Sequence, residues 1–148
     1  MNTPTIPTPA AKALQDHLRL LGKDPQAWLA LFGDDAVIEF PYSAKLGLPT
    51  EFRGKDAIAA HISRMVSAMH GLEISQVVIY PAADPSLAFA EFHAEALVGP
   101  GKHPYSQDYI AYAQLKDGKI ARYREYWDPI RVQGAVGTAA TKDAGAQA

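Results

Sequence analysis

The first candidate for a catalytic role is Glu125, which lies between Tyr123 and Trp127 near the end of the chain. Side chains alternate between the two faces of a strand, so these three share one face. A carboxylate on such an apolar face is costly to bury without a partner. Either an arginine neutralises Glu125, or the carboxyl group lies in a pocket and performs acid–base chemistry. The candidate partners are Arg53, Arg122 and Arg124.

Two further side-chain types could complete an acid–base site. His61 lies at the edge of an apolar helical stripe, and a helical histidine that faces a last-strand glutamate could share a proton with it. Such a pair would hold one acid and one base near neutral pH. Tyr105 and Tyr109 share a parity on their strand, and either could orient a carbonyl group. A structural role in packing is the alternative for each of these residues.

Glu91, His93 and Glu95 alternate on one strand face, which raises the question of a metal site. Side chains two residues apart on a strand rarely converge on one ion, so we expect no metal. The chain also has no cysteine, which excludes thiolate ligands and disulfides. We expect this face to be a polar outer or subunit-facing surface, paired with Arg122 and Arg124.

Helix and strand signals divide the chain in order. Capping residues and apolar periodicity predict helices over 9–21, about 25–32 and 55–69. Strands are predicted over 36–40, 73–80, 87–98, 105–116 and 119–127, with a loop over 41–53. The last four strands are joined by short turns such as Asp117-Gly118, which indicates an antiparallel meander. The expected fold class is α+β, with three N-terminal helices packed in the concave face of a curved antiparallel sheet and a conical pocket between them.

Composition and charge narrow the classes of function. The 148 residues are 48% hydrophobic, enough for one core, and the net charge is −2. Because basic residues are scattered, we expect neither nucleic-acid nor membrane binding. No apolar run approaches the ~20 residues of a transmembrane helix, and no signal-like hydrophobic stretch opens the chain, so a cytoplasmic location is expected. We expect a flexible arm at 1–8, one domain at 9–133 and a flexible Ala/Gly-rich tail at 134–148.

Three stretches resemble the SnoaL-like branch of the nuclear transport factor 2-like superfamily. They are residues 31–41, 52–54 and 117–120 with 125–129, and the likeness runs in order over roughly residues 10–133. The resemblance implies the cone-shaped fold described above. It implies less about activity, because this fold hosts isomerases, cyclases, dehydratases, epoxide hydrolases and non-catalytic binding proteins.

Among the subgroups, the ketosteroid isomerases fit poorly. Phe40 stands where they carry the catalytic aspartate base, their oxyanion-hole tyrosine falls near Asp16 or His17, and their oxyanion-hole aspartate falls near Ala111. Steroid isomerisation by their mechanism is therefore not expected. Trp127 does fall where those enzymes line the pocket with an aromatic residue.

The phenazine-biosynthesis A/B proteins match better. Their active-site histidine falls on His61, their active-site tyrosine on Tyr105 and their general-acid glutamate on Glu125. Met65 replaces their serine one turn after the histidine, which argues against the same substrate. The polyketide cyclases resemble the chain in an aromatic-Trp-Asp ending, which suggests Asp128 as an alternative acid or base.

The resulting hypothesis is a cofactor-independent acid–base enzyme that isomerises, cyclises, dehydrates or condenses an apolar, carbonyl-bearing small molecule. Glu125, His61 and Tyr105 would be catalytic. Further residues are expected as core or pocket lining: Trp28, Phe40, Tyr42, Met65, Tyr109 and Trp127. The alternatives are a small-molecule carrier or accessory protein with the same pocket and a protein–protein adaptor. The uncovered sheet face and the resemblance together predict a homodimer.

Overall fold

Capping residues and prolines set the helix starts in the structure, a computed structural model that describes residues 7–137. Helix α1 (Pro9–Leu20) begins after Thr8, whose side chain accepts a hydrogen bond from the backbone N–H of Ala11, and α2 (Pro25–Leu29) begins in the same way after Asp24. Helix α3 spans Lys55–Ala68 and α4 spans Pro129–Val132. No helix within residues 7–137 is long and apolar enough to cross a membrane.

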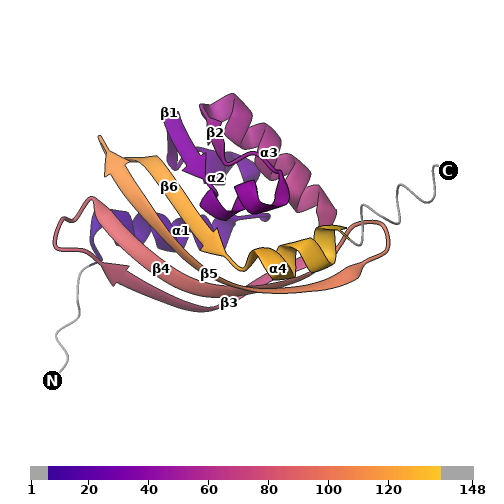
Figure 1. The fold of residues 1–148 in the computed structure, drawn as a ribbon. Helices are drawn as coiled ribbons and strands as arrows, with labels where there is room; N and C mark the ends of the chain where they lie inside the picture. The colour runs from indigo at the N-terminus through magenta and orange to yellow at the C-terminus, as the bar shows by residue number, and fades with distance from the viewer. Residues whose placement is uncertain (1–6, 138–148) are drawn as a thin grey trace, which may run out of the picture.

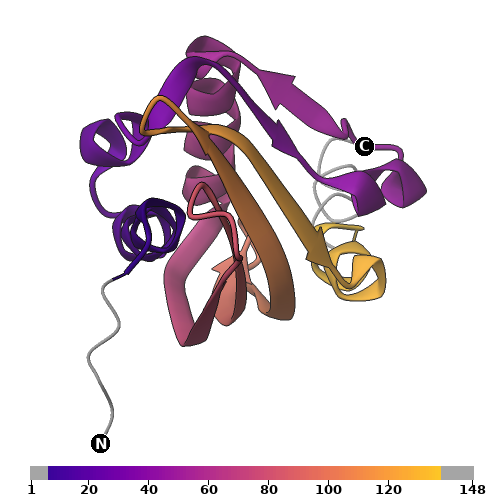
Figure 2. The same cartoon turned by 90° about the vertical axis from the view of Figure 1, so that its left-hand side faces the viewer.

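The strands form one sheet of six in the order β2-β1-β6-β5-β4-β3. Their bounds are β1 Phe32–Glu39, β2 Glu51–Arg53, β3 Met69–Pro81, β4 Leu87–Val98, β5 His103–Lys116 and β6 Lys119–Trp127. The last four form the predicted antiparallel meander. The long strands β3, β4 and β5 curve around the helices, and α4 follows directly from the end of β6 (Figure 1, Figure 2). The expected α+β class with a curved sheet is confirmed.

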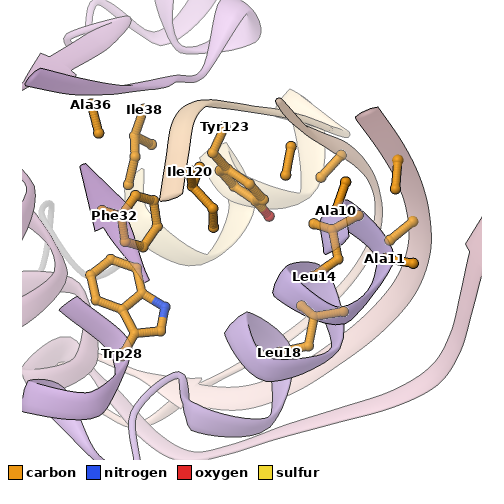
Figure 3. Close-up of a cluster of buried hydrophobic side chains, with 14 of the residues drawn as sticks. Ala10, Ala11, Leu14, Leu18, Trp28, Phe32, Ala36, Ile38, Ile120 and Tyr123 are labelled. Atoms are coloured by element: carbon orange, nitrogen blue, oxygen red, sulfur yellow. The ribbon is translucent and has the colours of Figure 1, made fainter. Parts of the chain in front are cut away.

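Small residues on the concave face make room for the helices. Ala88, Ala90, Ala111 and Ala113 lie side by side on β4 and β5 and are buried, so α1 packs closely onto these strands. The larger side chains of the core come from α1, α2, β1 and β6 (Figure 3). Across from this alanine patch, Ala113 pairs with Tyr123 and Ala111 pairs with Glu125. The alanines therefore leave space on the concave side where Glu125 projects.

A buried histidine joins α1 to α2 within this core. His17 is 3% exposed, and its Nδ1 accepts a hydrogen bond of 2.8 Å from the indole N–H of Trp28. Its ring centroid lies 4.5 Å from that of Tyr123. Burial lowers the pKa of His17 to about 4, so the imidazole is neutral at pH 7. This explains why a histidine is tolerated here, although its Nε2 has no hydrogen-bond partner within the described chain.

Several local predictions differ from the structure. Helix α2 ends at Leu29 rather than near residue 32, and strand β1 begins at Phe32 rather than at residue 36. The predicted loop 41–53 contains a 3-10 helix (Pro41–Leu46) and the short strand β2, whose three residues are too few to show alternation. Strand β1 pairs in parallel with β6, which makes the sheet mixed rather than purely antiparallel. Pairing between segments so far apart in sequence leaves no local signal.

The chain ends lie partly outside the described residues. Residues 1–6 of the predicted arm and 138–148 of the predicted tail are not described. Within the first residues of that tail, Ala135 is buried against Val98, Tyr105 and Val132. The contact extends the packed part of the chain past α4 to at least Ala135.

Candidate active site

A pocket of about 370 Å³ opens between the helices and the concave face of the sheet. It brings together Glu125 from β6, His61 from α3 and Tyr105 from β5, the three residues that sequence analysis predicted to be catalytic. Four of the predicted lining residues are also there: Phe40, Met65, Tyr109 and Trp127. The rest of the wall is mostly apolar, formed by Leu48, Pro49, Phe52, Met69 and Val132 together with Ser43 and Arg64.

Glu125 is half-buried because its carboxyl group faces this pocket. Tyr123 donates a hydrogen bond of 2.8 Å to its Oε1. Burial raises the pKa of Glu125 to about 7, and the Tyr123 hydrogen bond offsets only part of this effect. No described residue forms a hydrogen bond with the second carboxyl oxygen. Glu125 therefore carries a proton in much of the population at neutral pH and has an oxygen free to present it.

Tyr105 and Tyr109 form a pair beside Glu125. Their hydroxyl oxygens lie 2.8 Å apart, and one donates to the other. Burial raises the pKa of Tyr105 to about 12, and burial, followed by the nearby Tyr105 hydroxyl, raises the pKa of Tyr109. Both hydroxyls are consequently protonated at neutral pH. Because the pair uses one O–H internally, the second O–H is available to a ligand.

His61 forms the opposite side of the pocket. Its ring stacks on Phe52 with centroids 4.0 Å apart and packs against Phe40 at 5.3 Å. Desolvation, followed by the nearby charge of Arg64, lowers the pKa of His61. The imidazole is therefore neutral at pH 7 and able to accept a proton. No hydrogen bond or ion pair within residues 7–137 joins His61 to Glu125, although both side chains line the same pocket.

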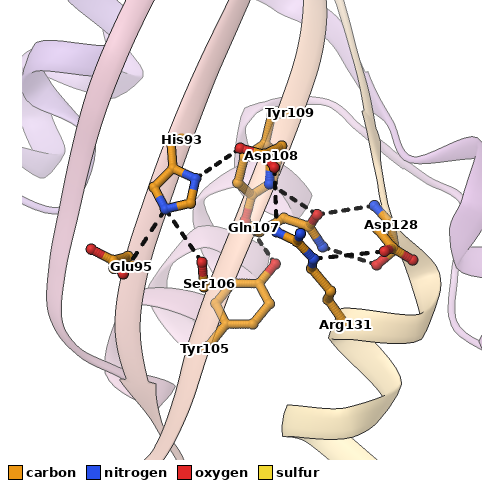
Figure 4. A network of polar contacts seen from close by, with 9 residues as sticks. All are labelled: His93, Glu95, Tyr105, Ser106, Gln107, Asp108, Tyr109, Asp128 and Arg131. Atoms are coloured by element: carbon orange, nitrogen blue, oxygen red, sulfur yellow. Dashed lines mark hydrogen bonds and ion pairs between the residues drawn. The ribbon is translucent and has the colours of Figure 1, made fainter.

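A buried glutamine fixes the rim of the pocket near Trp127. Gln107 is fully buried, and its amide donates to the backbone oxygen of Asp128 at 2.9 Å and accepts from the backbone N–H of Asp128 at 3.1 Å (Figure 4). These two bonds hold the end of β6 against β5. They also fix the start of α4, which places Val132 in the wall.

Three predicted site residues lie elsewhere. Trp28 is buried in the core, where its indole N–H is used by His17. Tyr42 is exposed and packs against Tyr126 on the outer side of the sheet, because the chain turns outward after β1. Asp128 is exposed and caps α4 by accepting a hydrogen bond from the backbone N–H of Ile130, so it does not reach the pocket.

The arginines considered as neutralising partners of Glu125 pair with other carboxylates. Arg122 and Arg124 both bind Glu39, and Arg53 lies 3.4 Å from Glu51. Glu39 is on β1, beside β6, on the convex side of the sheet. Glu125 therefore has no ion-pair partner among the described residues, which argues against the interpretation that it forms a structural ion pair.

The polar strand face around His93 is on the convex side, away from the pocket. His93 Nδ1 lies 2.8 Å from Asp108, and its Nε2 lies 3.3 Å from the hydroxyl of Ser106 (Figure 4). Arg131 also contacts Asp108. The predicted pairing of this face with Arg122 and Arg124 is wrong, since Glu39 occupies both.

Several pocket residues, and Tyr123 as the hydrogen-bond partner of Glu125, were not predicted from the sequence. Phe52 stands in one of the family-like stretches but was expected in a loop. Arg64 follows His61 by three residues, a helical spacing that places both on one side of α3. Tyr123 shares the strand parity of Glu125 and could have been identified as its partner from that alternation alone. Leu48, Pro49, Met69 and Val132 follow no pattern that would identify them.

Comparisons with known proteins identify the family of the chain. Residues 14–123 match the SnoaL-like domain family. The chain is 37% identical over 129 residues to an uncharacterized PhzA/B-like protein of Pseudomonas aeruginosa, covering 86% of this chain and 90% of that protein. It is 35% identical to a Bacillus subtilis protein provisionally named an isomerase, whose crystal structure superposes with a TM-score of 0.77 over 87% of this chain and 93% of that one.

A more distant similarity concerns the fold alone. The crystal structure of a Δ5-3-ketosteroid isomerase from Mycobacterium is 24% identical, with a TM-score of 0.66 over 84% of this chain and 96% of that one. The resemblance found in the sequence is thus confirmed over most of the chain. The protein belongs to the SnoaL-like domain family, within the nuclear transport factor 2-like superfamily.

Proposed function

We propose that this protein is a cofactor-independent acid–base enzyme that acts on an apolar, carbonyl-bearing small molecule. The observation that carries the proposal is the opposite tuning of two groups in one pocket: the pKa of Glu125 is raised and that of His61 is lowered. These opposite shifts leave Glu125 able to give a proton and neutral His61 able to accept one at the same pH. The mostly apolar wall suits an apolar ligand.

The chemistry follows from these protonation states. Glu125 gives its proton to the carbonyl oxygen while neutral His61 removes a proton from the adjacent carbon, which yields an enol, an imidazolium and the Glu125 carboxylate. In each reaction that follows, the enol O–H proton returns to Glu125 as the carbonyl re-forms, and the imidazolium gives its proton to the carbon, the electrophile or the leaving hydroxyl group. Return of the proton to another carbon isomerises the substrate. Attack of the enol on an electrophile cyclises or condenses it, and loss of a β-hydroxyl group as water dehydrates it. The free O–H of the Tyr105–Tyr109 pair donates to the same carbonyl oxygen and orients it.

Exchange of α-hydrogens tests the proposal without knowledge of the natural substrate. In D₂O, reversible enolisation replaces the α-hydrogens of a ketone such as 2-tetralone with deuterium, which NMR detects. We expect the protein to accelerate this exchange above the buffer rate. Binding of the ketone without accelerated exchange would contradict the enzyme and favour a small-molecule carrier with the same pocket.

We also propose that the chain forms a homodimer through the convex face of its sheet. Large hydrophobic side chains are exposed there on three adjoining strands: Val78 and Tyr80 on β3, Phe89 on β4 and Ile110 on β5. Tyr112 and Tyr126 extend this patch. Exposed apolar surface of this kind marks an association site, and a two-fold axis would pair the patch with its own copy.

Sedimentation tests the dimer. We expect the wild-type chain to sediment at twice its monomer mass at micromolar concentration. Ile110→Lys places a charge at the centre of the patch and should shift the protein toward monomer. Ile130→Lys is the matched control, because Ile130 is 76% exposed on α4, away from the patch, and should leave the mass unchanged. A wild-type monomer would contradict the proposal.

A further inference from the structure

Arg64 is the one arginine of the described chain for which the structure shows no carboxylate partner. Arg19, Arg53, Arg122, Arg124 and Arg131 each form at least one ion pair with aspartate or glutamate. Arg64 instead lines the pocket, three residues after His61 on α3. Within residues 7–137 its guanidinium has neither an ion pair nor a hydrogen bond to another residue.

The position of Arg64 divides the pocket into a charged rim and a polar interior. Arg64 is exposed, whereas Glu125 is half-buried and Tyr105 is buried. Only two other lining residues are ionisable in the range of interest, His61 and Glu125, and both are uncharged in a large share of molecules at pH 7. The guanidinium therefore sets a positive potential over an otherwise nearly neutral, apolar cavity.

A guanidinium suits one class of ligand in particular. Its planar array of N–H donors matches the two oxygens of a carboxylate, and the charge-assisted hydrogen bonds that result are stronger than neutral ones. Low-dielectric walls such as Phe52, Met65 and Met69 strengthen that attraction relative to bulk water. Because the Arg64 guanidinium has no partner among residues 7–137, its N–H donors are available to a ligand.

We propose that Arg64 binds an anionic group, with a carboxylate as the best match, on the end of the substrate that faces the pocket rim. The substrate is then an apolar carbonyl compound with one negative charge, its carbonyl directed toward Glu125 and its anion toward solvent. This inference rests on the proposed function only for the direction of the carbonyl. The anion site itself stands on the geometry of Arg64.

Anion binding at Arg64 also acts on His61. The charge of Arg64 contributes to the low pKa of His61, and a bound carboxylate would compensate that charge. His61 becomes a stronger base when an anionic ligand is present than when a neutral one is. Recognition of the correct substrate is thereby coupled to the basicity of the group that removes its proton.

A matched pair of ligands tests the anion site: 2-naphthoate and its neutral isostere 2-naphthamide, measured by calorimetry. The wild-type chain should bind naphthoate about tenfold more tightly, as expected for hydrogen bonds to a charged group. This preference should shrink as salt rises from low to physiological concentration, since Arg64 is exposed. Arg64→Gln should abolish the preference, and Arg64→Lys should keep part of it.

Arg53→Gln is the control, because Arg53 is exposed on β2 and does not line the pocket. It should leave the preference unchanged. The pKa of His61, followed by imidazole NMR, should rise with naphthoate and not with naphthamide. A wild-type chain that fails to prefer naphthoate, or a preference that survives Arg64→Gln, would overturn the proposal. Repeating the binding measurement in Glu125→Gln separates the two claims, since the preference should persist there even though exchange is lost.

Discussion

The Glu125→Gln variant should fold and bind 2-tetralone. It should catalyse exchange of the ketone's α-hydrogens about 10²–10⁴-fold more slowly than the wild type does. Glutamine keeps the shape of the side chain and can still accept the hydrogen bond from Tyr123. It has no titratable proton to give to the carbonyl oxygen. Initial exchange rates in D₂O, measured by NMR at saturating ketone, give this ratio.

Glu39→Gln provides the contrast that makes this result specific. Glu39 also carries a carboxylate close to β6, but it faces the convex side and binds Arg122 and Arg124. Its loss leaves two arginines without their partner and should lower stability while exchange continues at the wild-type rate. If Glu125→Gln instead kept full exchange activity, the acid assignment of Glu125 would be wrong.

We also expect the Glu125→Gln variant to have a larger free energy of unfolding than the wild type above pH 7. The pKa of Glu125 is raised from 4.5 to about 7 on folding, so the folded chain binds more protons than the unfolded chain between these values. The stability of the wild type therefore falls as pH rises from 4.5 through 7. The full shift corresponds to at most about 3 kcal/mol. Glutamine carries no charge at any pH and avoids this cost.

His17 makes the free energy of unfolding change with pH in the opposite direction. The comparison between wild type and variant must remove this contribution. Its pKa falls from 6.5 to about 4 on folding, so the unfolded chain binds more protons between these values and stability is lost as pH falls through them. The two slopes partly cancel in the wild type. The difference between wild type and Glu125→Gln, measured by urea unfolding at equal protein concentration from pH 4.5 to 8, isolates Glu125. That difference should grow with pH, and a variant that is less stable than the wild type at pH 8 would mean that Glu125 is structural.

The sequence indicated most of the architecture because its signals are local. Thr8-Pro9 and Asp24-Pro25 start helices through hydrogen bonds within one turn, and Asp117-Gly118 joins two strands that pair along their length. The pairing of β1 with β6 depends on residues about 90 positions apart, and strand β2 is only three residues long. Neither leaves a periodic pattern that could be detected.

The site was predictable to the extent that alternation and helical spacing apply. Strand parity alone places Glu125 with Tyr123 and Trp127, whereas the positions of His61 and Tyr105 came from the resemblance. Neither strand parity nor helical spacing separates a core residue from a pocket residue, so the sequence does not show that Trp28 of α2 belongs to the core, where its indole is bound to His17. The pKa of Glu125 depends on how many groups surround it in three dimensions, and no sequence pattern encodes that number.

Protonation of Glu125 in the pocket near neutral pH can be tested by a direct titration. Glutamate labelled with ¹³C at the side-chain carboxyl gives one NMR resonance per residue, and the resonance missing from Glu125→Gln assigns Glu125. We predict that this resonance titrates with a midpoint of about 7. A midpoint near 4.5, the ordinary value for a solvated glutamate, would contradict it.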